Sequence, residues 1–312
     1  MKLENFPEEI RDDLKRAMRL EYWNIGWTIS IIVAMGFAMG SSQTMKTAWV
    51  EDTLGLIPPI VFLVAVRFEG KGATKLFPFG FHRVHSFAFL IAAVALAAVG
   101  VSLLWDAMST LAAREHATVG TIHLFGRDLW AGWVMLAAMA YSIVPPLIVG
   151  WKEMPLSIRL QDEVIHTDAK MNKANWMTGA AGLFGVLGLG LGWWWADSVA
   201  AAIISFDIIL DGWMALRVAT AELVDGFPRK LGGKGPDPEA EKLIRKLKRQ
   251  YPGSDVRLRE TGRYIHAEIC GVEPDRAQDL KALWPGAARR SWRFAQLSFV
   301  PPDDSPGVPG EA

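Results

Sequence analysis

Acidic side chains stand beside or inside apolar stretches of this sequence, where their presence needs a chemical reason. Glu51 and Asp52 are adjacent and come just before the apolar run that starts at Leu54. Ionisable groups are costly in hydrocarbon, and carboxylates are hard oxygen ligands for divalent cations that release protons as the metal binds. The pair therefore predicts a cation site, with interfacial side chains that reach towards water as the alternative.

A second polar group shares one helical face, because spacings of three, four and seven residues match a period of 3.6: Asp168, Met171, Asn172 and Asn175. This stripe predicts further cation ligands, unless it is only the interfacial first turn of a span. Asp207 and Asp211 lie one turn apart in the next apolar run. They either line the cation pathway or bond a neighbouring helix.

Six apolar stretches are long enough to position these groups as membrane-spanning helices, since about 20 apolar residues cross the hydrocarbon core. We place the spans near residues 22–42, 47–66, 86–111, 129–150, 168–192 and 196–217. Lys and Arg are concentrated beside the span ends that lie on the same side of the membrane as both chain termini. The positive-inside rule therefore predicts a multi-pass protein of the cell membrane with both termini in the cytoplasm.

From Arg229 onward the composition is that of a soluble domain. The order of elements is helix, strand, strand, helix, strand, which predicts a small α+β ferredoxin-like domain. We place these elements at residues 239–249, 254–260, 263–272, 275–284 and 292–300, with a hairpin turn at Thr261-Gly262. The expected regions are a cytoplasmic segment (1–20), a six-helix transmembrane domain (21–227), the cytoplasmic α+β domain (228–302) and a disordered tail (303–312).

Several function classes are excluded by composition and motifs. The formal net charge is zero, so bulk electrostatics do not support a nucleic-acid partner. The carboxylates are not accompanied by a P-loop, an HExxH motif, a nucleotide-binding Gly pattern or a nucleophile with its base, so we do not expect an enzyme. The single cysteine, Cys270, excludes an internal disulfide.

Three segments of the chain resemble the cation diffusion facilitator family, in a variant branch with a non-standard transport site. They are GSSQTMKTAWVEDTLGL from Gly40, FPFGFHRVHS from Phe77, and TDAKMNKANW from Thr167. The resemblance covers nearly the whole chain, from Tyr22 to Val300. It implies a secondary transporter that exports a divalent cation by proton antiport and forms a homodimer through its tail, without a permanent cofactor.

The resemblance also implies ligand positions. The four ligands of the family's transport site fall on Glu51, Gly55, Met171 and Asn175, so the His and Asp ligands of a tetrahedral zinc site are largely replaced. Asp52, Asp168 and Asn172 can supply the missing oxygen atoms. Such a site suits Mn²⁺, Fe²⁺ or Mg²⁺ better than a thiophilic ion, although Met171 is a softer ligand. The residues do not decide between Mn, Fe, Zn, Co and Mg.

Other residues receive a structural interpretation. The family's basic residue before span three and its acidic partner after span six fall on Arg83 and Asp225, which implies a pair that holds the bundle near the tail. We expect His85 at the membrane surface. His166, with Asp162 and Glu163, is expected in a solvated cytoplasmic turn, with a role as a ligand at the entry to the cation path as the alternative. The alternative to transport is a family member that kept the scaffold but acts as a metal sensor or dimer partner.

Overall fold

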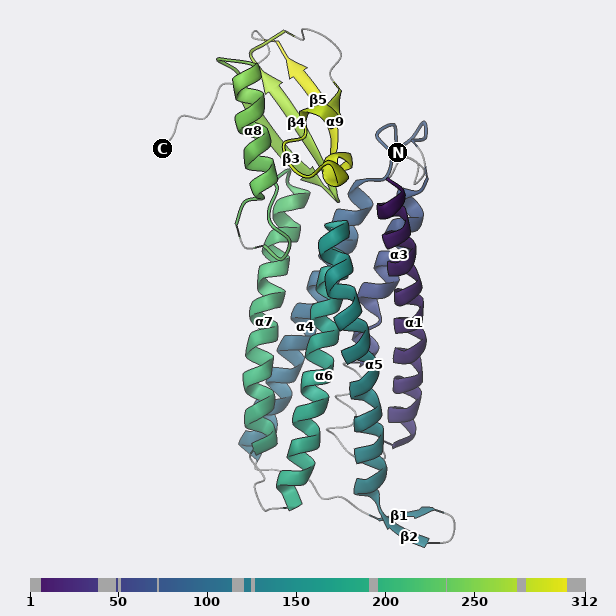
Figure 1. The fold of residues 1–312 in the computed structure, drawn as a ribbon. Coiled ribbons are helices and arrows are strands. Elements are labelled where there is room, and N and C mark those ends of the chain that lie inside the picture. Colours follow the sequence, from purple (N-terminus) through teal and green to yellow (C-terminus); the bar gives the residue numbers. More distant parts are fainter. Residues whose placement is uncertain are drawn as a thin grey trace.

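A bundle of long helices carries a small α+β domain at one end (Figure 1). The computed structural model describes residues 7–38, 49, 52–71, 73–113, 121–124, 127–190, 196–233, 235–273 and 279–301. The long helices of this described part are α1 (Glu8–Ala38), α3 (Ile57–Glu69), α4 (Arg83–Ala113), α5 (Ala131–Leu160), α6 (Glu163–Gly190) and α7 (Ala196–Leu223). The predicted disordered tail, 303–312, lies outside the described residues.

Most of these helices are longer than the spans predicted from hydropathy. All of them except α3 contain 28 to 31 residues. At about 1.5 Å per residue they measure about 42–46 Å, whereas the hydrocarbon core is only about 30 Å thick. Helix α1 starts at Glu8 and α5 continues to Leu160, so most of the predicted segment 1–20 and the residues after Gly150 extend the helices beyond the apolar core.

The outer surface of the bundle is rich in large apolar side chains. Phe37, Trp105, Trp151 and Trp213 are all exposed, and such extensive apolar surface is typical of contact with lipid. Among the described residues, α4 is the helix that is long and apolar enough to cross a membrane by length and composition alone. The arrangement of six spans therefore stays a prediction.

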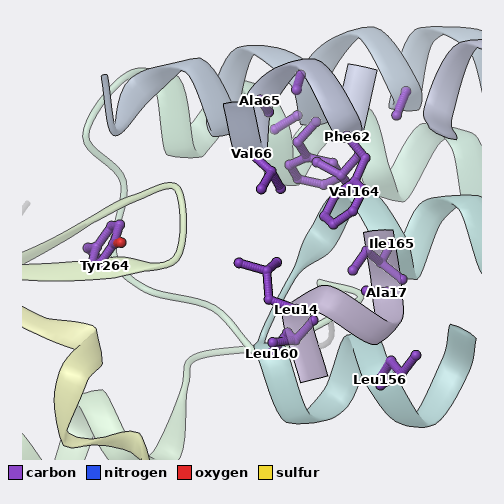
Figure 2. Close-up of a cluster of buried hydrophobic side chains, with 14 of the residues drawn as sticks. Leu14, Ala17, Phe62, Ala65, Val66, Leu156, Leu160, Val164, Ile165 and Tyr264 are labelled. Carbon is purple, nitrogen blue, oxygen red and sulfur yellow. The ribbon is translucent and has the colours of Figure 1, made fainter. Parts of the chain in front are cut away.

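An apolar core fills the end of the bundle nearest the α+β domain (Figure 2). Phe62 of α3, Leu160 of α5 and Ile165 of α6 are completely buried there. Tyr264, from the α+β domain, belongs to the same cluster and is 1% exposed. The C-terminal domain thus contributes a side chain to the core of the bundle and is packed against it.

The C-terminal domain contains α8 (Pro238–Gln250), β3 (Asp255–Thr261), β4 (Tyr264–Cys270), α9 (Leu280–Leu283) and β5 (Phe294–Val300). The sheet order is β3-β4-β5, with β3 and β4 antiparallel and β4 and β5 parallel. Leu243 and Leu247 of α8 pack on Ile265 and Ile269 of β4, so the amphipathic helix covers one face of the sheet.

The predicted order of the tail elements agrees with the structure, but two details differ. Thr261 pairs with Tyr264, so the hairpin turn consists of Gly262 and Arg263 rather than Thr261 and Gly262. Gly262 has φ +61°, and a Cβ there would lie 2.9 Å from the carbonyl oxygen of His82. Within the described residues, the predicted helix 275–284 is only the single turn of α9.

A second hairpin lies at the far end of the bundle (Figure 1). Its strands, β1 (Thr121–Leu124) and β2 (Arg127–Trp130), pair antiparallel immediately before α5. This hairpin differs from the sequence-based prediction, in which the fourth span begins at Leu129. Helix α5 begins two residues later, at Ala131.

Candidate metal centre

Two members of the polar stripe on α6 face α1 and α5. Asp168 and Asn172 are both buried. The amide nitrogen of Asn24, on α1, donates to Asp168 Oδ2 at 3.0 Å. The Asn172 amide nitrogen donates to Glu153 Oε2, on α5, at 3.0 Å and to Asp168 Oδ2 at 3.4 Å. These contacts join the three helices through oxygen-rich side chains.

Three carboxylates come together at this point. One oxygen each of Glu21, Glu153 and Asp168 lies within 4.8 Å of the others, and we call these residues the carboxylate cluster. All three side chains are buried, and Glu21 is 0% exposed. Both carboxylate oxygens of Glu21, and Oε1 of Glu153, are buried without a hydrogen-bond partner. The cluster is therefore a concentration of buried negative charge.

Asp168 and Asn172 belong to the polar stripe that predicts cation ligands, whereas no sequence pattern singled out Glu21 and Glu153. Both glutamates lie just outside the predicted spans, at positions where a charged residue is expected beside water. A signal was present in the sequence, since Glu21 and Asn24 are three residues apart and share one face of a helix. Only the packing of α1 against α5 and α6 shows that this face is internal.

The other stripe residues have different surroundings. Met171 is 1% exposed and packs with side chains of α4 and α7, while Leu54 and Ile57 at the start of α3 pack against the same cluster. The predicted common face of α6 is thus divided: Asp168 and Asn172 contact α1 and α5, and Met171 lies towards α3, α4 and α7. Asn175, one turn further along, has a buried Oδ1 without a hydrogen-bond partner.

Asp52 stands in a helical turn just before α3 and is half-buried. Two residues later, Leu54 contacts the cluster that contains Met171, which brings the start of α3 beside α6. Glu51, its predicted partner, lies outside the described residues. Asp52 is thus two residues from a side chain that packs on the cluster of Met171, and it is not a member of the carboxylate cluster.

The acidic stripe predicted on the last span has a different environment from the carboxylate cluster. Asp211 accepts a hydrogen bond from Lys170 Nζ at 2.8 Å, and this ion pair links α7 to α6. One of the two alternatives for Asp211, a bond to a neighbouring helix, is therefore what the structure shows. The side chain of Asp207 lies outside the described residues.

The implied structural pair is present at the tail end of the bundle. Arg83 Nη2 lies 2.6 Å from Asp225 Oδ1, and Arg259 of β3 lies 3.3 Å from the same oxygen. Both Arg83 and Asp225 remain about half exposed to solvent. Water therefore screens this pair, and exposed ion pairs contribute about 0–1 kcal/mol.

Replacing Arg83 by Ala is accordingly expected to lower the free energy of unfolding by about 1 kcal/mol or less. Thermal unfolding of the purified protein in detergent, at low and high salt, measures the effect. The small difference between variant and wild type should shrink further at high salt because exposed charges are screened. A loss of several kcal/mol would show that the pair holds the domains together by itself.

A buried ionic network lies deeper in the same interface, and we call it the tail latch. The Arg263 guanidinium, at the tip of the β3–β4 hairpin, pairs with Glu69 of α3 and with Asp162 between α5 and α6. Tyr264 Oη donates to Glu69 Oε1 at 2.7 Å, and His85 Nε2 lies 2.9 Å from Asp162 Oδ2. All of these side chains are buried.

The tail latch corrects two expectations about surface residues. His85, expected at the membrane surface, is 4% exposed, and Asp162, expected in a solvated turn, is 0% exposed. Burial raises the pKa of Asp162, but the neighbouring His85 and Arg263 outweigh this and hold the pKa below its usual value. Asp162 therefore stays ionised at neutral pH, as a partner of Arg263 requires.

Comparison with known proteins agrees with these features. A model of the cation efflux transmembrane domain matches residues 25–224, which is most of the chain. The chain belongs to the cation efflux family. The family match confirms the resemblance to cation diffusion facilitators. Members of this family are membrane proteins that transport cations and are not enzymes.

Individual relatives of this cation efflux protein are distant. It is 23% identical over 229 residues to the manganese efflux system protein MneS of Bacillus subtilis, which covers 73% of each chain. It is 22% identical over 252 residues to the zinc transporter ZitB of Escherichia coli, covering 78% of this chain and 69% of ZitB. A cadmium, cobalt and zinc/H⁺-K⁺ antiporter of Bacillus velezensis is 25% identical over 215 residues, covering 64% of this chain and 63% of the relative.

Proposed function

We propose that this cation efflux protein is a secondary transporter that exports a divalent metal cation in exchange for protons. The ion binds between α3 and α6, which correspond to the second and fifth predicted spans, and both termini lie in the cytoplasm. Relatives named for manganese efflux, zinc transport and antiport of cadmium, cobalt and zinc support a divalent metal as substrate. We also propose that the protein acts as a homodimer.

The observation that carries the binding site is the contact between the start of α3 and the deeper α6 stripe. Leu54 and Ile57 pack against the cluster of Met171, which supports a position of the Asp52 turn beside α6. We call Glu51, Asp52, Met171 and Asn175 the α3–α6 site. Asn175 offers a buried carbonyl oxygen that makes no hydrogen bond in the structure. Asp168 and Asn172 line α6 one turn nearer the tail.

The ligand set of the α3–α6 site favours a hard ion. Carboxylate and amide oxygens suit Mn²⁺ and Mg²⁺, whereas a thioether is a softer ligand. A carboxylate must lose its proton before it coordinates a metal, so metal and proton compete for the same oxygen atoms. This competition couples metal export to proton import, because each turn of the cycle exchanges one occupant for the other.

Proteoliposomes that contain the purified protein and an internal pH-sensitive dye test this proposal. Mn²⁺ is supplied on the side of the membrane that carries the tail. We expect Mn²⁺ to enter the liposomes and protons to leave them. Parallel measurements with Zn²⁺, Co²⁺, Fe²⁺ and Mg²⁺ rank the substrates. Mn²⁺ uptake without any proton movement would contradict antiport, and absence of flux for every metal would contradict transport.

The alternative of a metal sensor or dimer partner rests on two positions, Gly55 and Asn175, where ligands of the family's transport site fall. Gly55 is buried and has no side chain, although the family's second ligand of span two falls on it. A site that has lost a ligand can retain metal binding but lose the exchange step. Movement of the tail on addition of metal, without flux in proteoliposomes, would favour this alternative.

A further inference from the structure

The carboxylate cluster contains more negative charge than its protein surroundings balance. Glu21, Glu153 and Asp168 come from α1, α5 and α6, and each is nearly or completely buried. Within the described part of the chain, no Lys, Arg or His forms an ion pair with any of them. A buried charge without a partner is strongly unfavourable. The cluster therefore requires cationic occupants, which are either protons or a metal ion.

The spacing of the oxygen atoms fits a single metal ion. A hard divalent cation binds oxygen at about 2.1–2.5 Å, so two ligands on opposite sides of it are about 4.2–5.0 Å apart and adjacent ones are closer. One carboxylate oxygen from each of the three residues lies within 4.8 Å of the other two. One ion can therefore contact all three carboxylates without a large rearrangement of the helices.

The unpartnered oxygens are a second and independent indication of a ligand. Both oxygens of Glu21 are buried and accept no hydrogen bond, and neither does Oε1 of Glu153. Buried polar atoms in native proteins are nearly always satisfied, so atoms left without a partner call for an explanation such as a bound ion. These orphaned oxygens belong to two of the three residues of the carboxylate cluster.

Two amides hold the remaining oxygens in place. Asn24 and Asn172 both donate to Asp168 Oδ2, and Asn172 also donates to Glu153 Oε2. Hydrogen bonds of this kind orient ligating carboxylates around a metal, and their loss typically weakens binding by about 10–100-fold. The amides engage Asp168 Oδ2 and Glu153 Oε2, and they leave Glu153 Oε1 and both oxygens of Glu21 without a protein donor.

From this arrangement we infer that Glu21, Glu153 and Asp168 form a second cation site, which takes a hard divalent ion such as Mn²⁺ through oxygen ligands. It is separate from the α3–α6 site, because its other members are on α1 and α5. Asp168 and Met171 are three residues apart on α6, a rise of about 4.5 Å along the helix. The second site thus lies on the tail side of the α3–α6 site and is where an ion arriving from that side stops first.

Equilibrium binding of Mn²⁺ to the full-length protein in detergent tests this inference without requiring transport. Electron paramagnetic resonance of free Mn²⁺ gives the number of bound ions and their affinity. We expect Glu21→Gln and Glu153→Gln each to lose one bound Mn²⁺ or to bind it at least about 10-fold more weakly than wild type. Asp52→Asn should retain that ion, which separates failure of this site from failure of the α3–α6 site.

Glu222→Gln is the matched control. Glu222 is also buried in the bundle, but it accepts hydrogen bonds from Ser86 Oγ and Gly262 N, which an amide oxygen can replace. We expect wild-type Mn²⁺ binding in this variant. Mn²⁺ binding by Glu21→Gln and Glu153→Gln with wild-type stoichiometry and affinity would overturn the inference and leave protons as the occupants.

Anomalous diffraction from Mn²⁺ in wild-type crystals provides a second test, and we expect a peak among the three carboxylates. An Mn²⁺ peak only elsewhere would also overturn the inference.

Discussion

Replacing Arg263 by Ala is expected to destabilise the protein by about 3–5 kcal/mol, because it leaves buried carboxylates without their cation. Arg263 is 1% exposed and pairs with Glu69 and Asp162, which are also buried. Burial raises the pKa of Glu69, but Arg263 and His85 more than offset this, so the pKa is lowered overall. Without the guanidinium, the carboxylates of Glu69 and Asp162 remain buried away from water but lose the positive charge that stabilises them.

The hairpin tip is the part of the tail that should respond first. In Arg263→Ala we expect the tail to dissociate from the bundle at a lower temperature than in wild type. The measurements are the melting temperature and the temperature at which protease cleaves near the linker at 230–238, and both should be lower. Arg259→Ala is the control, since its partner Asp225 is half exposed and the expected loss is about 1 kcal/mol or less. Equal stability of the two variants would show that the tail latch does not hold the domain in place.

The tail latch also shows what sequence patterns cannot provide. His85 and Asp162 were expected near water because each stands in a polar stretch between apolar spans. Both belong to the network around Arg263, which lies 194 residues from its partner Glu69 in the chain. No local pattern encodes a contact over such a separation, since the periodicity of a strand shows which residues share a face but not what that face meets.

The tail itself was predictable in outline. Alternating apolar residues in β3 and β4, and the amphipathic spacing of Leu243 and Leu247, depend only on local geometry. Element ends were less predictable: the hairpin turn moved by one residue, and the helices of the bundle continue past the apolar windows. A polar helix end keeps its hydrogen bonds in water, so hydropathy does not mark where such a helix stops.

The candidate sites show the same difference between residues that local spacing predicts and residues that only the packing of helices reveals. Spacing alone grouped Asp168 and Asn172, and the two side chains do share hydrogen-bonding surroundings. Spacing also placed Met171 with them, although a stripe about 100° wide can touch different neighbours on its two edges. Glu21 and Glu153 were missed because their significance depends on the packing of α1 against α5 and α6. Glu51 stays a prediction, since it lies outside the described residues.

The acidic pair before α3 supplies two carboxylates that can bind a metal ion or a proton. Glu51→Gln and Asp52→Asn keep the size and shape of each side chain but remove a negative charge and a proton-exchanging group. If the pair ligates the ion in the α3–α6 site, either change should weaken metal binding by about 10–100-fold or more and slow transport accordingly. Neither side chain belongs to the tail latch, so the melting temperature should change little.

Asp12→Asn provides the matched control for this experiment. Asp12 is exposed on α1, and its oxygen lies 3.4 Å from Lys15 Nζ in a pair that water screens. The substitution removes the same charge as Asp52→Asn but at a place remote from the sites proposed above. We expect wild-type transport, within the uncertainty of reconstitution.

The initial rate of Mn²⁺ uptake into proteoliposomes tests the central claim most directly, namely that carboxylates beside α6 bind the exported ion. We predict that Asp12→Asn matches wild type and that the rates of Glu51→Gln and Asp52→Asn fall by about 10–100-fold or more, towards the rate of empty liposomes. Wild-type rates in both acidic-pair variants, for Mn²⁺ and for every other divalent metal tested, would contradict it.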